Sequence, residues 1–304
     1  MTFPASIARK SPVLRAAYLA FVLALLAVWL LPLAGVALTA MRSMDEINRA
    51  AFWDWPVEPQ LLLNLRTVLA GSPIGMFVVN SFLITVPAVA GSVLVASMAG
   101  FALAKHAFPG NRVLLMLFVA GNLVPAQVLM IPVRDLMIAI GLYDTRFALI
   151  LFHTAFQTGF ATLFMRNFIR ELPDSVFDAA RVEGASELVI FWRIALPLVR
   201  PAMAAIGVLI FTFVWNDYFW SLVLVQSDAI RPLTAGLQSL RGMYQTAWNL
   251  MCAAALLAAL PPVAVFFVLQ KHLVAGLTAV ERILIMLLIP PQAKTLIILS
   301  FTLI

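Results

Sequence analysis

The densest group of polar side chains in this chain is DAARVEGASELVIFWRIALPLVRP, residues 178–201, which interrupts an otherwise apolar sequence. Its residue types offer ion pairing and docking rather than bond cleavage. Asp178 and Arg181 have the three-residue spacing of an ion pair on one helix face. Helices that lie on lipid headgroups usually carry Lys and Arg on their polar face, whereas this region holds four acids: Asp174, Asp178, Glu183 and Glu187. The region either lies in the membrane interface or docks into the groove of a partner, and its residues alone leave both open.

Patterns typical of catalytic or metal sites are missing from the sequence. There is no G-x-x-x-x-G-K-[ST] pattern to hold nucleotide phosphates, no H-E-x-x-H and no spaced Cys and His cluster for a metal ion. Cys252 is the one cysteine, so an internal disulfide is excluded. Of the scattered His106, His153 and His272, we expect His153 to be a paired histidine inside a span. We expect no catalytic residue, no cofactor and no metal.

Membrane helices must position the polar segment. Of the 304 residues, 63% are hydrophobic and 11% are charged, against about 45–50% and about 25% in soluble domains. A membrane span needs about 20 apolar residues. Five runs lack Asp, Glu, Lys and Arg, and a sixth contains only Asp217: 16–41, 67–104, 113–133, 147–165, 242–270 and 201–225. The sequence predicts an all-α polytopic membrane protein with six transmembrane helices, the first being too long for a cleaved signal peptide.

The distribution of positive charge predicts the orientation of these spans. With six spans, both termini and the loops at 105–112 and 166–200 lie on one side. Without the tail after residue 279, that side carries eleven Lys and Arg, against seven in the opposite loops. The bias predicts that both termini and the polar segment are cytoplasmic. No basic stripe or aromatic platform accompanies the net charge of +6, so no nucleic-acid partner is expected.

A short helix is expected at 175–183, within the polar segment. Asp174 and Ser175 are good N-cap residues, and Ser175 with Asp178 has the spacing of a capping box. Gly184 suits the left-handed position that ends a helix. Helices of about ten residues are marginal alone in water, so this one must pack against another surface.

A second short helix is expected at 187–195, after the glycine joint. Ser186 is its expected cap, and Pro197 should stop it. Short cytoplasmic helices therefore connect the fourth and fifth spans. In the third span Pro125 is expected to produce a kink. In the second span, small residues spaced by four should allow close helix packing: Ser92, Ala96, Gly100 and Ala104.

The polar segment resembles the EAA loop of ABC-transporter permease subunits. In that loop an acid-Ala-Ala triplet precedes an acid-Gly-Ala triplet and a later Leu-Pro. Here these positions hold Asp178, Ala179, Ala180, Glu183, Gly184, Ala185, Leu196 and Pro197. Two of them depart from the usual pattern, since Asp178 replaces Glu and Glu183 replaces Asp, and both keep the charge. Stretches matching the maltose-type carbohydrate branch follow in order: NSFLITVPAV, FALAKHAFPGNR, LVPAQVLMIPVRDLMIAIGLYDT, FVWNDYFWSLVL and LQKHLVAGLTA.

The resemblance implies a permease subunit of a binding-protein-dependent importer in the bacterial inner membrane. Its partners would be a second homologous permease subunit, an ABC ATPase dimer, an extracytoplasmic solute-binding protein and membrane lipid. Hydrolysis of ATP would belong to the partner, so this chain would not be an enzyme. Transport would proceed by alternating access, with the eight EAA positions coupling it to the ATPase. The implied organisation is a cytoplasmic N-terminus at 1–15, a permease domain at 16–279 with a coupling loop at 170–200, and an atypical apolar tail at 280–304.

Polar groups inside the spans are candidates for the translocation path: Asn122, Gln157, Trp215, Asn216 and Asp217. Their amides and aromatic rings suit a neutral, hydroxyl-rich solute such as a sugar or polyol. Bonds between helices are the alternative role for Asn122 and Gln157. Asp217 lies about 24 Å along its span at about 1.5 Å per residue, near the outer interface, where a structural role competes with solute contact.

Two other functional classes are weighed against this interpretation. A secondary transporter or channel working without ATP should pair acids within its spans, and only Asp217 lies in one. A structural membrane scaffold would not need the acidic loop. The tail after GLTA has two apolar runs that are each too short to span. It either lies in the membrane interface or has no role in transport, and the second is expected.

Overall fold

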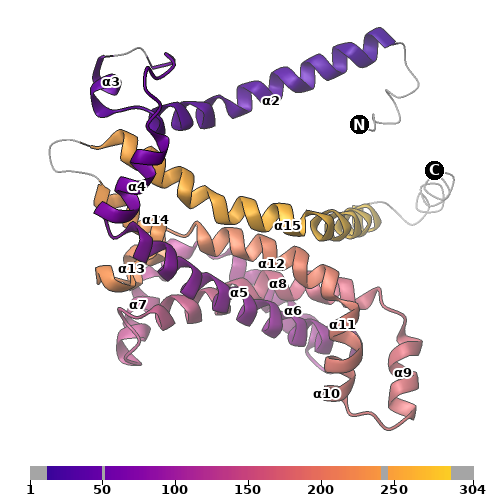
Figure 1. The fold of residues 1–304 in the computed structure, drawn as a ribbon. Coiled ribbons are helices and arrows are strands. Elements are labelled where there is room, and N and C mark those ends of the chain that lie inside the picture. The colour runs from indigo at the N-terminus through magenta and orange to yellow at the C-terminus, as the bar shows by residue number, and fades with distance from the viewer. Residues whose placement is uncertain (1–11, 50–51, 241–245, 289–304) are drawn as a thin grey trace. The chain divides into compact units, whose positions relative to one another are not determined.

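The chain folds into helices throughout residues 12–49, 52–240 and 246–288, which are the residues that the computed structural model describes (Figure 1). Four helices are long and apolar enough to cross a membrane: α2 (Pro12–Ala40), α5 (Ile74–Lys105), α8 (Arg146–Arg170) and α15 (Trp248–Leu288). Two bent pairs raise the count to six if each is one span. The six expected spans are thus accounted for among the described residues. The tail from residue 289 and the N-terminus up to residue 11 lie outside them.

The first bent pair is the third expected span, broken near Pro125. It consists of α6 (Asn111–Leu123), a 3-10 turn η1 (Ala126–Leu129) and α7 (Met130–Ala139), bent by 93°. Proline lacks the N–H that would continue the helix, and its ring disfavours helical geometry in the residue before it. The kink expected at Pro125 is confirmed, and it breaks the helix.

The second bent pair contains the second half of the polar segment, from Glu187 onwards. Its first arm comprises α10 (Glu187–Ile190), a π-helical turn η2 (Phe191–Ala195) and α11 (Leu196–Leu198). Its second arm is α12 (Arg200–Trp215), inclined by 75° to the first. The short helix α13 (Phe219–Leu224) completes the predicted run at 201–225.

The expected run at 67–104 is not one helix. It is divided between α4 (Leu61–Gly71) and α5, with Ser72 extended between them. Ser72 Oγ donates to the Val68 carbonyl at 2.5 Å. The boundary between α4 and α5 comes at the Ser-Pro pair before Ile74. The prediction missed it because it relied on the absence of charged residues, and none occurs at this boundary.

The described residues divide into two compact units. The first contains α2, α3 (Met44–Arg49), α4 and residues 237–258. Asn64 forms several side-chain hydrogen bonds within this first unit. Its amide nitrogen donates to the carbonyls of Ala40 and Arg42, both at 2.9 Å, and its oxygen accepts from Asn249 at 3.1 Å. These bonds order the connection between the first two predicted spans.

The second unit comprises residues 76–236 and the part of α15 from residue 259. In its core, the small residues of α5 face α8. Ser92 and Ala96 are fully buried, and a Cβ on Gly100 would lie 2.8 Å from the backbone nitrogen of Arg166. The close packing expected from the four-residue spacing is confirmed for these three residues, while Ala104 is partly buried. Because the backbones of α5 and α8 approach closely at Gly100, the C-terminal end of α8 is held beside the C-terminal end of α5.

Candidate functional site

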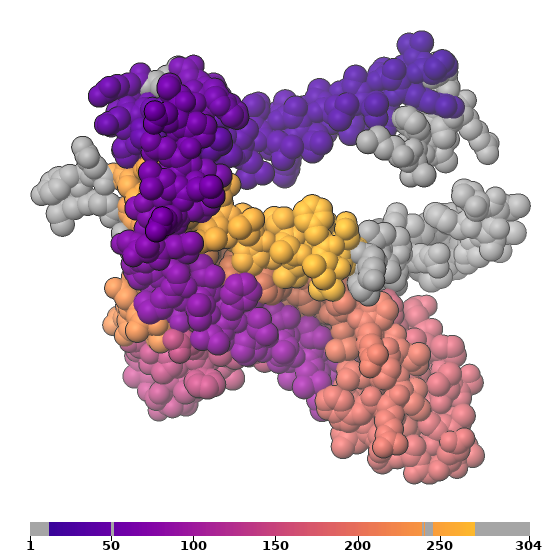
Figure 2. Space-filling view, viewed as in Figure 1, coloured from indigo at the N-terminus to yellow at the C-terminus, as the bar shows by residue number. Residues whose placement is uncertain are grey.

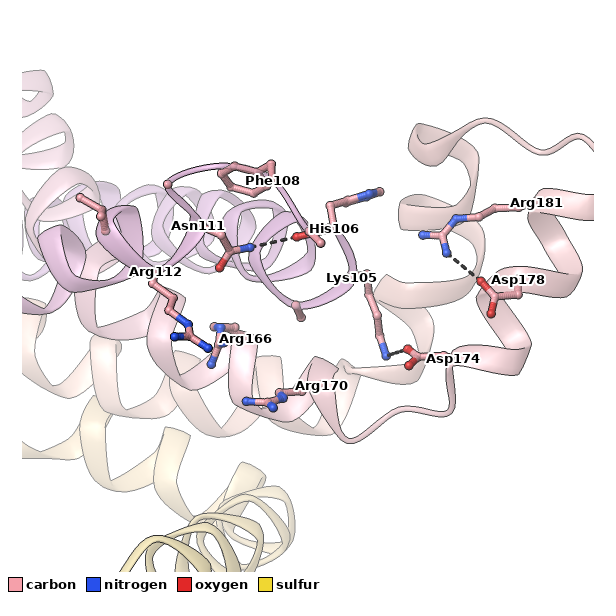
Figure 3. Close-up of a pocket in the computed structure, with 14 residues that line it drawn as sticks. Lys105, His106, Phe108, Asn111, Arg112, Arg166, Arg170, Asp174, Asp178 and Arg181 are labelled. Atoms are coloured by element: carbon pink, nitrogen blue, oxygen red, sulfur yellow. Dashed lines mark hydrogen bonds and ion pairs between the residues drawn. The ribbon is translucent and has the colours of Figure 1, made fainter.

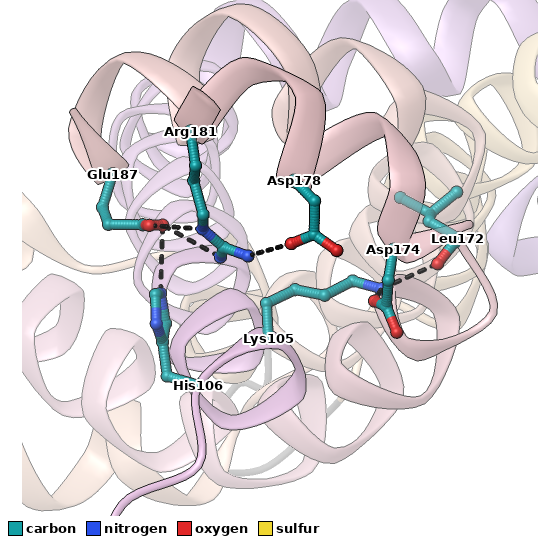
Figure 4. A network of polar contacts seen from close by, with 7 residues as sticks. All are labelled: Lys105, His106, Leu172, Asp174, Asp178, Arg181 and Glu187. Carbon is teal, nitrogen blue, oxygen red and sulfur yellow. Dashed lines mark hydrogen bonds and ion pairs between the residues drawn. The ribbon is translucent and has the colours of Figure 1, made fainter. Parts of the chain in front are cut away.

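The polar segment is anchored at its start by Lys105, the last residue of α5. Lys105 Nζ lies 2.6 Å from Asp174 Oδ1 and donates to the Leu172 carbonyl at 2.7 Å (Figure 4). Hydrogen bonding from this ammonium, with its charge, holds the pKa of Asp174 below its usual range. Asp174 is the first residue of α9 (Asp174–Val182), and no side chain caps this helix. The capping box expected from Ser175 and Asp178 is therefore wrong: Ser175 lies inside the helix rather than at its cap, and Asp178 pairs with Arg181.

A second polar cluster closes the joint between α9 and α10. Arg181 lies 2.9 Å from Asp178 and 2.7 Å from Glu187, and Glu187 lies 3.2 Å from Nε2 of His106 (Figure 4). The Asp178–Arg181 pair expected from the spacing is confirmed. The bridge to Glu187 was not foreseen, although Glu187 lies one residue after the expected cap. It holds the two short helices together, and His106 ties them to the loop after α5.

Gly184 provides the turn between these helices, as predicted. Its φ is +81°, in the left-handed region that favours glycine. The Gly184 amide donates to the Arg181 carbonyl at 3.0 Å, and the Ala185 amide donates to the Ala180 carbonyl at 3.0 Å. These bonds satisfy carbonyl groups at the end of α9. The turn sets the angle at which α10 leaves.

The second short helix differs from its prediction in how it ends. Ser186 stands at the cap position without a side-chain bond. Pro197 does not stop the helix, because the backbone widens into a π turn just before it. The Leu196 amide bonds to the Phe191 carbonyl, five residues back, and proline supplies no N–H to this ladder. The chain bends only at Val199, where α12 begins.

The coupling segment, defined as residues 174–198, has an inner and an outer face. Phe177, Ile190 and Phe191 are buried against the end of α5, where Phe101 contacts two of their rings. On the outer face Val182 is 89% exposed and Leu188 is 62% exposed. In the space-filling view this segment forms a lobe at one end of the second unit (Figure 2). Apolar side chains therefore remain uncovered on the outer face of the segment.

The eight EAA positions are divided between these faces. Ala180 is buried, so its small size serves packing inside this chain rather than the approach of a partner. The other seven are exposed or half-buried: Asp178, Ala179, Glu183, Gly184, Ala185, Leu196 and Pro197.

Asp217 makes a structural cluster at the far end of α12. Its carboxylate accepts from the amides of Trp220 and Ser221 at 3.2 and 3.0 Å and from the Ser221 hydroxyl at 3.1 Å. His153 Nε2 lies 3.6 Å from the same carboxylate, and the His153 side chain is 5% exposed. The expectation of a paired histidine is confirmed. Sequence reasoning singled out both residues but missed their contact, because 64 positions separate them along the chain.

Asn122 lies at a cavity of about 370 Å³ between the broken third span and α8. The other lining side chains are apolar, and the Asn122 amide donates to the Phe118 carbonyl at 2.9 Å. Gly159 of α8 makes room for this amide, since a Cβ there would overlap it. Gln157 is half-buried on α8 and does not line the cavity.

The remaining path candidates lie apart from Asn122. Trp215 is buried, with ring contacts to Phe82 and Phe211. Asn216 is exposed and donates to the Thr212 carbonyl at 2.8 Å. The cavity at Asn122 includes none of Trp215, Asn216 and Asp217. The described residues thus do not gather the five path candidates into one site.

Known proteins are similar to this chain in sequence. The family model described as binding-protein-dependent transport system inner membrane component matches residues 92–279. The osmoprotective compounds uptake permease protein GgtD of Synechocystis sp. is 35% identical over 258 residues, which cover 83% of this chain and 87% of the relative. The alpha-glucoside transport system permease protein AglG of Rhizobium meliloti is 36% identical over 222 residues, 71% of this chain and 58% of the relative.

A solved structure has the same fold. It is the crystal structure of a bacterial ABC transporter involved in the import of the acidic polysaccharide alginate. One of its chains superposes with a TM-score of 0.74 and 24% identity, over 86% of this chain and 98% of that chain. At that identity the match establishes the fold alone.

Proposed function

Because this chain belongs to the family of binding-protein-dependent transport system inner membrane components, we propose that its coupling segment receives the motion of the ATPase and that its solute is a sugar or polyol. The chain is a permease subunit of an ABC importer, and the ATPase is a separate subunit. The family match gives no support to a secondary transporter or channel without ATP coupling. The proposal concerns two points: which residues couple transport to the ATPase, and which class of solute is transported.

One observation supports the coupling role. One face of the segment packs against the rest of this chain, and the opposite face is exposed. Its inner face is held by the Lys105–Asp174 ion pair at 2.6 Å and by buried aromatic rings. Its outer face leaves Val182 and Leu188 mostly exposed. Exposed apolar groups with a polar rim are typical of protein interfaces. A segment that were merely lying on headgroups would instead carry Lys and Arg on its polar face.

The connections of the segment support transmission of motion to two spans. At one end Lys105 links α9 to the last turn of α5. At the other end α11 passes into α12 through the bend at Val199. Arg181 joins the two halves by pairing with Asp178 and Glu187. A displacement of the outer face would therefore move the ends of α5 and α12 together, which alternating access requires.

The organisation expected from charge and resemblance is kept as part of the proposal. Both termini are cytoplasmic, and the permease domain extends over 16–279 with its coupling loop at 170–200. The proposed partners are a second homologous permease subunit, an ABC ATPase dimer and an extracytoplasmic solute-binding protein. The positive-charge bias supports the orientation. The tail at 280–304 is proposed to have no part in transport, although α15 continues as a helix to Leu288.

The proposed solute class rests on the lining of the path and on the relatives. The relatives are named for the uptake of osmoprotective compounds and of alpha-glucosides. In this chain Asn122 brings an amide to an otherwise apolar cavity, and a single amide among apolar groups suits a neutral polar solute. We keep Asn122, Gln157 and Asn216 as path residues. For Trp215 and Asp217 the contacts favour a structural role.

The coupling role is tested with a matched pair of valines. Val182 on the outer face is 89% exposed, and Val57 in the first unit is 87% exposed. Val182→Asp should reduce retention of the ATPase by about tenfold or more, because burying a valine contributes about 1.5–3 kcal/mol and an unpaired carboxylate in an interface adds a further cost. Val57→Asp should retain the ATPase. Equal retention by both variants would show that this face is not the coupling surface.

A further inference from the structure

A second polar feature borders the coupling segment: a pocket of about 720 Å³ beneath α9. It is lined by the loop after α5, the first turn of α6, the last turns of α8 and part of α9 (Figure 3). Five Lys and Arg side chains line it, with two Asp. The coupling role leaves this pocket unexplained, because neither Val182 nor Leu188 lines it.

The two acids of the pocket are already neutralised by two of its cations. Asp174 pairs with Lys105 at 2.6 Å, and Asp178 pairs with Arg181 at 2.9 Å. The cations that remain are Arg112, Arg166 and Arg170. Among the described residues, none of these three has a carboxylate within ion-pair distance. The pocket therefore carries an uncompensated positive charge.

Of the three, Arg166 is the one with a buried donor that lacks a partner among the described residues. Its Nε is buried and has no hydrogen-bond partner, and Nη1 donates only to the neighbouring Asn167 at 3.3 Å. Arg170 lies four residues further along α8, a spacing that places like charges on one face and destabilises the helix. A buried cationic donor without a partner is costly. An anion between these guanidinium groups would offset both costs.

The geometry favours a tetrahedral oxyanion. Arg112 lies in the first turn of α6, and Arg166 and Arg170 lie in the last turns of α8. Figure 3 shows all three at the pocket, apart from the two ion pairs. The first N–H groups of α6 lack acceptors within the helix, and a helix N-terminus favours negative charge. Arginine presents a planar fork of donors that matches the oxygens of phosphate.

We propose that Arg112, Arg166 and Arg170 form a binding site for a phosphate group. The three arginines lie at the ends of α6 and α8, which are long or apolar enough to belong to membrane spans. Headgroups would meet water near such ends, so the phosphate of an anionic phospholipid is one source. Basic pockets between membrane helices bind such headgroups on the cytoplasmic side. A soluble phosphate is the other source. The cytoplasmic placement rests on the orientation given under the proposed function.

The test compares bound lipid in the assembled importer. The complex is placed in bilayer discs made of equal phosphatidylcholine and phosphatidylglycerol, and retained lipid is counted by native mass spectrometry. The exposed pair Arg112→Gln with Arg170→Gln should lower phosphatidylglycerol retention by about tenfold or more, since charge-assisted bonds are strong. Arg112→Lys with Arg170→Lys should retain an intermediate amount. Arg200→Gln, an exposed arginine outside the pocket, should match the unaltered protein.

A second arm separates the two sources. In discs of phosphatidylcholine alone, millimolar inorganic phosphate is added and thermal unfolding is followed. Stabilisation of the unaltered protein, but not of the glutamine pair, would assign the site to a soluble phosphate. If neither lipid retention nor phosphate stabilisation differs between the glutamine pair and Arg200→Gln, the site is refuted. Lipid counting does not require the ATPase, so loss of the ATPase in the valine experiment leaves this result readable.

Discussion

The turn at Gly184 gives the sharpest test of how the coupling segment is built. Its φ of +81° is costly for a residue with a side chain. A Cβ placed on Gly184 meets nothing within 4 Å, so within this chain a substitution there acts on the backbone alone. Valine and asparagine are of similar size, but asparagine tolerates the left-handed region and β-branched residues do not.

The expected magnitude follows from this difference. A residue with a Cβ pays about 1–2 kcal/mol in the left-handed region, and 1.4 kcal/mol corresponds to a factor of ten in an equilibrium. Gly184→Val should therefore reduce the population of the native turn by about tenfold, while Gly184→Asn should stay near the unaltered protein. The two bonds that close the turn, at 3.0 Å each, would be lost with it. The angle between α9 and α10 would change, and with it the face presented to the ATPase.

The assay measures solute uptake and ATPase retention for both variants at equal membrane expression. We expect Gly184→Val to lose coupling, by failing either to retain the ATPase or to link hydrolysis to uptake. We expect Gly184→Asn to keep both. If valine and asparagine impair the importer equally, side-chain bulk against the partner explains the effect and the conformational reasoning is refuted. Normal uptake by Gly184→Val would refute the role of the turn itself.

Three further predictions concern residues that hold the coupling segment and the helices of the second unit in place. Lys105→Met should remove the largest effect that lowers the pKa of Asp174. A lowered folded pKa contributes stability that is complete above the unfolded value of about 4 and is lost as the pH falls through the folded pKa. The thermal-stability advantage of the unaltered protein over this variant should therefore be present at neutral pH, begin to decline at about pH 4 and disappear at more acidic pH. Gly100→Val should lower stability by about 1–3 kcal/mol, since its Cβ would lie 2.8 Å from a backbone nitrogen of α8, whereas Gly121→Ala, with nothing within 4 Å, should be tolerated. Asp217→Leu should cost about 1–3 kcal/mol by leaving buried donors unpaired, more than Asp217→Asn, as followed by thermal unfolding.

The sequence was most informative where a residue's backbone chemistry decides the structure. Pro125 breaks the third span, and Gly184 adopts the left-handed turn. Both follow from the conformational range of one residue type. The Asp178–Arg181 pair at 2.9 Å also follows from local spacing. Such features need no knowledge of which helices are neighbours.

The sequence was least informative where a side chain chooses between a local and a distant partner. Asp174 was expected to serve as a cap, yet it pairs with Lys105 from 69 positions away. His153 was expected to be paired, but its partner Asp217 could not be named. The cluster of Arg112, Arg166 and Arg170 was invisible for the same reason, because two helices supply it. Spacing along a chain says nothing about contacts that tertiary packing creates.

The error at Pro197 shows how a local rule fails when the backbone has a further option. A proline in a regular helix removes one bond and clashes with the preceding turn. The π turn before it, closed by the bond from Leu196 to Phe191, widens the helix at that point. The arm at 187–198 therefore stays continuous up to Val199, and the bend of 75° lies at the entry to α12 rather than at the proline. Such π turns are frequent at functional sites. A continuous arm joined to its span at one bend can transfer a displacement from the outer face to α12, whereas a break at Pro197 would have added a second joint and absorbed part of it.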